Sequence, residues 1–247
     1  IRVEENAAML NELCQRAAKR HITLYSRFLN LAQQREGEIA ARRAGAEYCL
    51  YGGAQDCERR MLAVSGEDVP DESLFRIACL LAAPRSARFA APIAHRDVLG
   101  ALMGLGIERE MIGDIVLREA GAYIFCVERM VDFICQSLVQ IGRTDVRCER
   151  AEPPQGALRE TREVRLQVSS PRLDAIAAHL FHLSRGDAQQ LFRQGRVMVD
   201  DAPCERPDYQ LRDGQVISVR GYGRAQYLGV DGQSKKGKDV VRIALYS

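Results

Sequence analysis

Arginine side chains recur between residues 172 and 196 at intervals that would bring them to one surface. Arg185, Gln189 and Arg193 lie four residues apart, so on a helix they would form a single exposed line. Arg172 precedes this line and Arg196 follows it. A guanidinium offers a planar fork of hydrogen-bond donors that fits phosphate oxygens. The spacing indicates a surface that binds a phosphate backbone, although a merely solvated helix face would carry the same pattern.

A second basic group lies near the end of the sequence. Glycines separate its members and let a backbone approach phosphates closely. The members are Arg220, Arg224, Lys235, Lys236 and Lys238. Residues 158–247 carry 15 Lys and Arg against 11 Asp and Glu, whereas residues 1–157 carry 20 against 22. This asymmetry favours a polyanionic partner for the C-terminal part. We expect a flexible basic hairpin here, and a tail that only improves solubility is the alternative.

Residues that resemble catalytic motifs lack the partners that catalysis would need. His95, Arg96 and Asp97 follow the order of the protein-kinase catalytic triplet, but no Asn stands at the required spacing and no DFG accompanies them. His179 and His182 lie three residues apart without an evident third metal ligand. The eight cysteines form no C-x-x-C pair, and we expect them to be reduced. The sequence predicts no catalytic residue, no metal and no cofactor.

The arginines of the first group are expected on two short helices. The first helix is defined by apolar residues at helical spacing, namely Leu173, Ile176, Leu180 and Leu183. Ser184 is expected to cap the second helix, with Asp187 at the acidic position of a capping box. Gly195 is expected to end the second helix. Strands are then expected over 197–199 and 216–220, separated by turn residues.

Residues 74–150 show strands and helices in the order β-α-β-β-α-β. This order predicts a ferredoxin-like sandwich with two helices on one face of an antiparallel sheet. The RNA-recognition motif shares this topology and stacks bases on aromatic residues of its sheet. Here the strands offer mainly Phe75, Tyr123 and Phe125. We therefore favour a structural or protein-docking role for this domain, because fold alone does not confer function.

The whole chain is expected to have the α+β class. Helical periodicity over the first 45 residues predicts a helical hairpin, followed by strands at Tyr48–Tyr51 and Met61–Val64. We expect an N-terminal helical and αβ region, a central ferredoxin-like domain, a linker and a C-terminal domain with a basic hairpin, over residues 1–73, 74–150, 151–163 and 164–247. No apolar run is long enough to span a bilayer, and the start of the sequence is acidic where a secretion signal would be basic. We expect a cytoplasmic protein with no membrane partner.

The segment from Arg172 to Gly221 resembles the S-four domain, the RNA-binding module named after ribosomal small-subunit protein four. The resemblance rests on the order and spacing of RLD, LSRGDA, LFRQGRVMVDD and PDYQLRDGQVISVRG. The sequence departs from the family at Asp200-Asp201, where Asn-Gly is usual, but Asp can form a similar turn. The resemblance implies that RNA is gripped by the two-helix face, which corresponds here to Arg172, Ser184, Arg185, Gln189, Arg193 and Arg196.

Most of the remaining chain resembles the bacterial YlmH family. The resemblance is carried by YGGAQDCERRML, HRDVLGALMGLGIEREMIGDIVL and RGYGRAQYLGVDGQSKKGK. It implies a central domain like the RNA-recognition motif, a C-terminal S-four domain and a non-catalytic role on rRNA or tRNA of the large ribosomal subunit, in the rescue of stalled nascent chains. An RNA-modifying enzyme such as a pseudouridine synthase, or a protein adaptor in ribosome assembly or cell division, is the alternative.

Overall fold

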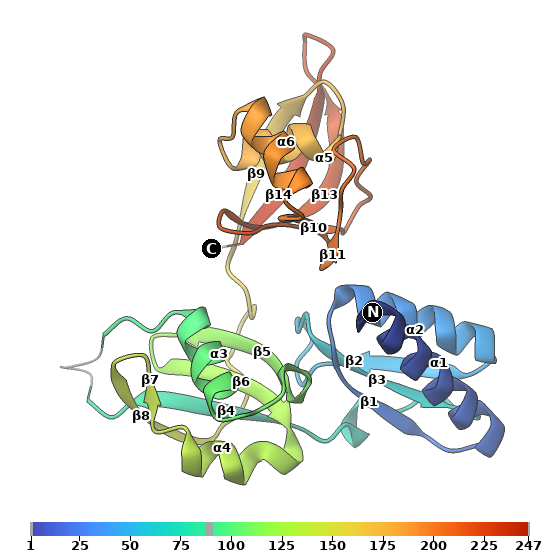
Figure 1. The fold of residues 1–247 in the computed structure, drawn as a ribbon, viewed down its shortest axis with the longest axis vertical. Helices are drawn as coiled ribbons and strands as arrows, with labels where there is room; N and C mark the ends of the chain where they lie inside the picture. Colours follow the sequence, from blue (N-terminus) through green and yellow to red (C-terminus); the bar gives the residue numbers. More distant parts are fainter. Residues whose placement is uncertain (1, 87–90, 247) are drawn as a thin grey trace. The chain divides into compact units, whose positions relative to one another are not determined.

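The computed structural model describes residues 2–86 and 91–246, apart from the side chains of residues 2–5 and 185. The chain divides into two compact units, residues 1–158 and residues 159–247. Figure 1 shows the helices and strands that make up each unit. Within the described residues, no helix combines the length and the hydrophobicity needed to cross a membrane.

The first unit begins with two helices packed on a three-stranded antiparallel sheet. The helices are α1 (Arg2–Arg20) and α2 (Leu31–Ala44), and the sheet has the order β1-β3-β2, with β1 (Leu24–Leu29), β2 (Glu47–Tyr51) and β3 (Arg60–Ser65). The two later strands confirm the sequence-based prediction. A helical hairpin over the first 45 residues is wrong, however, because β1 lies between the helices. Ser26 and Phe28 are buried while Arg27 between them is exposed, which is the alternation of a strand.

The rest of the first unit is a ferredoxin-like sandwich, as the order of elements predicted. Its elements are β4 (Ile77–Pro84), α3 (His95–Gly104), β5 (Ile112–Arg118), β6 (Gly121–Val127), α4 (Val131–Ser137), β7 (Gln140–Ile141) and β8 (Thr144–Arg150), with single 3-10 turns η1 (Glu72–Leu74), η3 (Arg109–Met111) and η4 (Glu128–Met130). The antiparallel sheet has the order β5-β6-β4-β8-β7. Val98 and Leu102 of α3 and Ile134 of α4 share one buried core with Leu80 and Ile124 of the sheet.

The opposite face of this sheet is covered rather than open. Phe125 is fully buried in a cluster with Cys57 and Leu158. Gly53 has a φ of +99°, and a Cβ added there would come within 2.7 Å of the Phe125 ring. Phe75 is also buried, at 7% exposure. Phe75 and Phe125 therefore both contribute to the core, and neither ring is available to stack on a base.

The connection between the units is shorter than the predicted linker over 151–163. Leu158 is 5% exposed and packs with the first unit. The first strand of the second unit, β9, already begins at Thr161. Residues 1–73 and 74–150 belong to one compact unit. Their division into two independent domains stays a prediction.

The second unit has two helices against a six-stranded antiparallel sheet of order β11-β10-β12-β13-β14-β9 (Figure 1). Its elements are β9 (Thr161–Val168), α5 (Leu173–Leu180), α6 (Arg185–Arg193), β10 (Val197–Val199), β11 (Ala202–Pro203), β12 (Val216–Val219), β13 (Gly223–Gln233) and β14 (Asp239–Tyr246). Leu173, Ile176 and Phe192 of the helices share a core with Tyr227 and Ile243 of the sheet. The predicted basic hairpin exists, but its strands are integral to the sheet: β13 pairs with β12, and β14 pairs with β9.

Candidate nucleic-acid interface

The two helices of the second unit are set by short-range interactions at their ends. Ser184 accepts a hydrogen bond from the Asp187 amide at 3.1 Å, and its hydroxyl donates to the Asp187 carboxylate at 2.6 Å. This contact confirms the predicted cap of α6. At the other end Gly195 has a φ of +62°, and the Arg196 amide donates to the Leu191 carbonyl at 3.0 Å. The caps fix where α6 begins and ends, and so fix the positions of Gln189 and Arg193.

A hollow of about 590 Å³ lies beside α5 and α6, and we call it the α5–α6 groove. It is lined by residues of β9, α5, α6 and the segments next to them, together with the residue before β14, namely Gln167, Val168, Ser169, Arg172, Asp174, Ala175, Ala178, His179, Leu183, Ala188, Gln189 and Lys238. The groove brings together two of the predicted site residues, Arg172 and Gln189. It also includes His179, which the sequence did not single out for this site, and Lys238, which the sequence places in the basic hairpin.

Arg172 is held in place within the groove by Asp174. Its Nε and Nη2 donate to the two carboxylate oxygens of Asp174 at 3.0 and 2.8 Å. The hydrogen bond and the charge of Asp174 raise the pKa of the Arg172 guanidinium further above its ordinary value. A guanidinium has five N–H donors, so this two-point contact leaves donors for another acceptor. Asp174 therefore orients Arg172 without using all of its hydrogen-bonding capacity.

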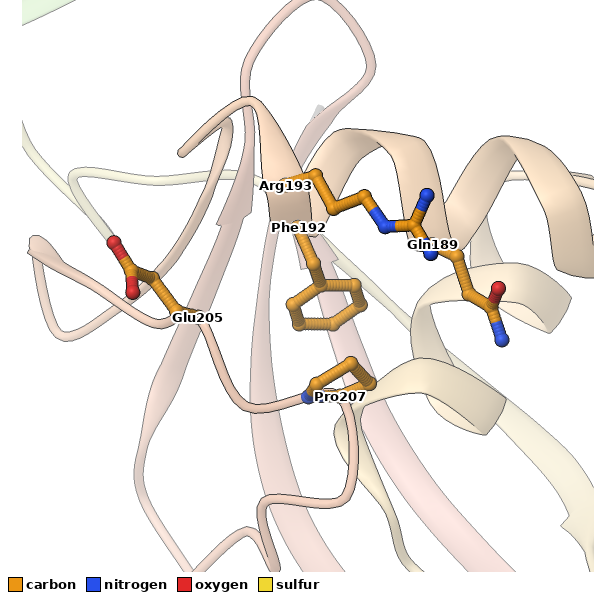
Figure 2. Close-up of a pocket in the computed structure, with 5 residues that line it drawn as sticks. All are labelled: Gln189, Phe192, Arg193, Glu205 and Pro207. Carbon is orange, nitrogen blue, oxygen red and sulfur yellow. The ribbon is translucent and has the colours of Figure 1, made fainter.

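A second, smaller hollow of about 490 Å³ adjoins α6 on the side of the loop after β11. Its lining residues are Gln189, Phe192, Arg193, Glu205 and Pro207. Figure 2 shows the Arg193 side chain extending toward Gln189, the Phe192 ring facing Pro207, and Glu205 on the opposite side. Gln189 lines both hollows, so this side chain connects the two parts of the helical surface. Arg193 and Gln189 are both exposed.

The other predicted residues whose side chains the structure describes fall outside these two hollows. Arg196 donates from Nη2 to the Arg220 carbonyl at 2.6 Å, so it joins the end of α6 to the turn between β12 and β13. Arg224 forms an ion pair with Asp201 at 3.0 Å. Lys235 and Lys236 are exposed in the turn between β13 and β14. Arg185 begins α6, but its side chain lies outside what the structure describes, and its role stays a prediction.

The motif that resembles a kinase triplet serves as a helix start. Asp97 accepts a hydrogen bond from the Ala94 amide at 3.0 Å and stands in the first turn of α3. Among the described residues, no group of three or more His, Cys, Asp and Glu side chains is arranged to hold a metal ion.

Known proteins match the chain in both units. Residues 70–154 match the family described as "Putative RNA-binding domain in YlmH", and residues 171–217 match the family described as "S4 domain". "Ribosome-associated protein quality control protein P2" of Bacillus subtilis is 33% identical over 194 residues, which cover 76% of this chain and 73% of that protein. "Small ribosomal subunit protein uS4" of Macrococcus caseolyticus is 44% identical over 64 residues, which cover 26% of this chain and 31% of that protein.

One solved structure supports the fold. It is "Cell division protein ylmH from Streptococcus pneumoniae", with a TM-score of 0.52 and 22% identity. The match covers 61% of this chain and 92% of the other. At this level of identity the match shows a shared architecture and carries no statement about activity.

Proposed function

The chain belongs to the YlmH family, and from that premise we propose that it is a non-catalytic RNA-binding factor of the large ribosomal subunit. Its S-four unit would hold the backbone of rRNA or tRNA. The relative from Bacillus subtilis carries the name of a ribosome-associated quality-control protein. We extend that role to this chain as part of the proposal: a cytoplasmic factor that acts in the rescue of stalled nascent chains.

The observation that carries the proposal is the composition of the α5–α6 groove. Arg172, His179, Gln189 and Lys238 come from separate segments of the chain and line one hollow. Lys238 reaches it because Asp239, its neighbour, pairs with Val168 in the β14–β9 ladder. Arginine, lysine and amide donors around one concave surface favour phosphate and sugar oxygens. Most protein hydrogen bonds to a nucleic-acid backbone use donors of these kinds.

An enzyme is supported less well than a binding factor. His95, Arg96 and Asp97, which resemble a catalytic triplet, form the first turn of α3, and the Asp97 carboxylate accepts a hydrogen bond from the Ala94 amide. The two histidines near the end of α5 lie in different surroundings. His179 lines the α5–α6 groove, while His182 lies beyond the end of the helix and has a φ of +52°. A metal-ligating pair would need both imidazoles directed at one point, together with further ligands.

The proposal is tested by measuring RNA affinity at several salt concentrations. The probe is a fluorescently labelled RNA hairpin, and its anisotropy is recorded with the purified chain between 50 and 200 mM salt. If four or five phosphates are neutralised, affinity falls about 150- to 500-fold over this range, taking the slope of duplex DNA as a guide. An affinity that does not change with salt would contradict the proposed interface.

A double variant, Arg193→Ala with Arg220→Ala, locates the interface on the second unit. Both side chains are exposed, so the variant is expected to keep its melting temperature. The slope of log affinity against log salt is expected to become shallower by about 0.9 for each phosphate that is no longer neutralised. Arg143→Ala is the matched control, because Arg143 is exposed in the first unit. An equal loss of affinity in the control would place the interface elsewhere.

A further inference from the structure

Tyr222 stands on a tight turn beside Arg220 and is not itself one of the proposed RNA-backbone contacts. The turn joins β12 to β13, and it is closed by a hydrogen bond from the Tyr222 amide to the Val219 carbonyl at 2.9 Å. Gly221, the third residue of the turn, has a φ of +87°. This geometry is that of a type II turn, which requires glycine at that position. The backbone therefore fixes the point from which the Tyr222 side chain leaves the sheet.

The glycines on both sides of Tyr222 also make room for its neighbours. A Cβ on Gly221 would lie 2.7 Å from Nη2 of Arg196, and a Cβ on Gly223 would lie 3.1 Å from the Phe181 ring. The guanidinium of Arg196 lies 5.9 Å from the centre of the Tyr222 ring. The Phe181 ring lies 6.4 Å away, tilted by 54°. Tyr222 is thus framed by a cation and an aromatic ring drawn from two other segments.

The exposure of Tyr222 distinguishes it from a tyrosine of the core. Its side chain is 47% exposed, whereas Tyr227 in the adjoining strand is 2% exposed. The surrounding contacts orient the Tyr222 ring and leave about half of it to solvent. Arg220, the neighbour of Gly221, is exposed as well. An oriented aromatic surface next to guanidinium groups has the chemistry of a nucleobase platform, because bases stack on aromatic faces while cations hold the adjacent phosphates.

We propose that Tyr222 stacks on an unpaired nucleobase and that Arg196 and Arg220 hold the phosphates next to it. The inference rests on the proposed function and specifies its substrate: an RNA that presents an unpaired nucleotide beside a helix. A continuous A-form duplex keeps its bases stacked on one another, so it offers no free base face to a side chain. Stacking of this kind tolerates all four bases, since each has an aromatic face.

The experiment compares two RNA hairpins with the same stem, each closed by an ethylene-glycol linker in place of loop nucleotides, so that neither has unpaired loop bases. One is blunt, and the other has a three-nucleotide overhang that contains 2-aminopurine. Wild-type chain is expected to bind the overhang hairpin more tightly and to quench the 2-aminopurine fluorescence. Tyr222→Leu is expected to lower affinity for the overhang hairpin by about 5- to 150-fold, the range seen for loss of one base–aromatic stack. Its affinity for the blunt hairpin should stay unchanged, and Tyr222→Phe should behave as wild type.

Phe133→Leu is the matched control, because Phe133 is an aromatic residue of the first unit with 44% exposure. Equal wild-type affinity for both hairpins without quenching would overturn the inference while leaving the proposed function in place. Unchanged affinity of the Tyr222→Leu variant for the overhang hairpin would also overturn the inference and leave the proposed function in place. If wild-type chain binds neither hairpin, the proposed function itself fails and the inference fails with it. The quenching measurement uses wild-type protein, so it is informative even if a variant does not fold.

Discussion

Arg224 and Asp201 form an ion pair that ties strand β13 to the turn between β10 and β11. The Arg224 Nη2 lies 3.0 Å from the Asp201 carboxylate, and their side chains are 35% and 19% exposed. Strand β12 lies between β13 and β10 in the sheet, so the pair spans a neighbouring strand. Arg224 stands among the residues that the sequence predicts to bind RNA. Its contact with Asp201 gives it a structural role in the free protein.

The first prediction separates Arg224 from Arg220. Arg224→Ala is expected to lower the stability of the second unit by about 1 kcal/mol, because the partly buried Asp201 carboxylate loses a charged partner. This corresponds to a drop in melting temperature of about 4–8 °C for a unit of this size. Arg220→Ala is expected to weaken RNA binding and to leave the melting temperature unchanged. Melting curves and RNA titrations of both variants test this, and the reverse assignment of effects would contradict it.

The second prediction concerns Asp200, which is 3% exposed. Its carboxylate accepts hydrogen bonds at 2.8 Å from the Val216 amide and at 2.8 Å from the Gln215 side chain. Asp200→Ala would leave buried donors without this acceptor, so we expect a loss of about 2–3 kcal/mol in the free energy of unfolding. Asp200→Asn keeps one acceptor oxygen and should cost less. Denaturant titration measures both, together with hydrogen exchange at Val216; unaltered exchange in Asp200→Ala would argue against the contact.

The third prediction concerns Asp114 in the first unit. Asp114 is 6% exposed and accepts hydrogen bonds from the amides of Glu58 and Arg59 at 2.7 and 3.0 Å. These contacts anchor the segment that covers Phe125. Asp114→Ala is expected to destabilise the unit by about 2 kcal/mol and to accelerate hydrogen exchange across residues 52–59. Asp145→Ala, an exposed acid of the same unit, is the control; equal exchange in both variants would show that the anchor is unimportant.

The fourth prediction concerns thiol reactivity. Burial raises the pKa of the Cys79 and Cys126 thiols to about 12. At pH 8 only about one thiol in ten thousand would then be the reactive thiolate. Cys49, Cys135 and Cys204 are half-buried, and we expect them to react with iodoacetamide before the buried thiols. Mass spectrometry of the native protein after brief labelling measures the order, and early modification of Cys79 or Cys126 would contradict it.

The raised pKa values of the Cys79 and Cys126 thiols also predict how the stability of the protein changes at alkaline pH. A thiol whose pKa is raised from 9.0 to about 12 on folding favours the folded state fully at pH values below 9. As pH rises from 9 toward 12, the unfolded chain releases these protons first, and the contribution is lost. Cys79→Ser with Cys126→Ser should therefore show a smaller decline in stability over this window than wild type, when denaturation midpoints are compared.

Local signals in the sequence were enough to predict the start of α6. Ser184 accepts a hydrogen bond from the Asp187 amide, which is the N-cap that their spacing predicts. The Asp187 carboxylate accepts from the Ser184 hydroxyl, whereas a capping box would use the Ser184 amide. Apolar runs and the turn residues between them likewise predicted the main strands of the ferredoxin-like sheet. Strand β1 was missed because its apolar residues also fit helical spacing, and its pairing partner β3 lies more than 30 residues later. Long-range pairing decided the structure in this case.

The candidate site was predictable only in part for the same reason. Arg172 and Gln189 were expected on one surface and do line one groove. Lys238 joins them through the register of β14 against β9, which pairs Asp239 with Val168. The sequence between these strands carries no local sign of that register. The contact of Arg224 with Asp201 depends in the same way on the order of strands in the sheet, and charge alone could not distinguish this arginine from an exposed one.

The central claim is that this chain docks on the large ribosomal subunit through its S-four unit. The most direct test is sedimentation of the purified chain on sucrose gradients with isolated large subunits and, separately, with isolated small subunits, at low salt. We expect the wild-type chain to travel with large subunits alone, and the Arg193→Ala/Arg220→Ala variant to remain at the top of both gradients. Wild-type chain that stays at the top, or that travels with small subunits, would contradict the account.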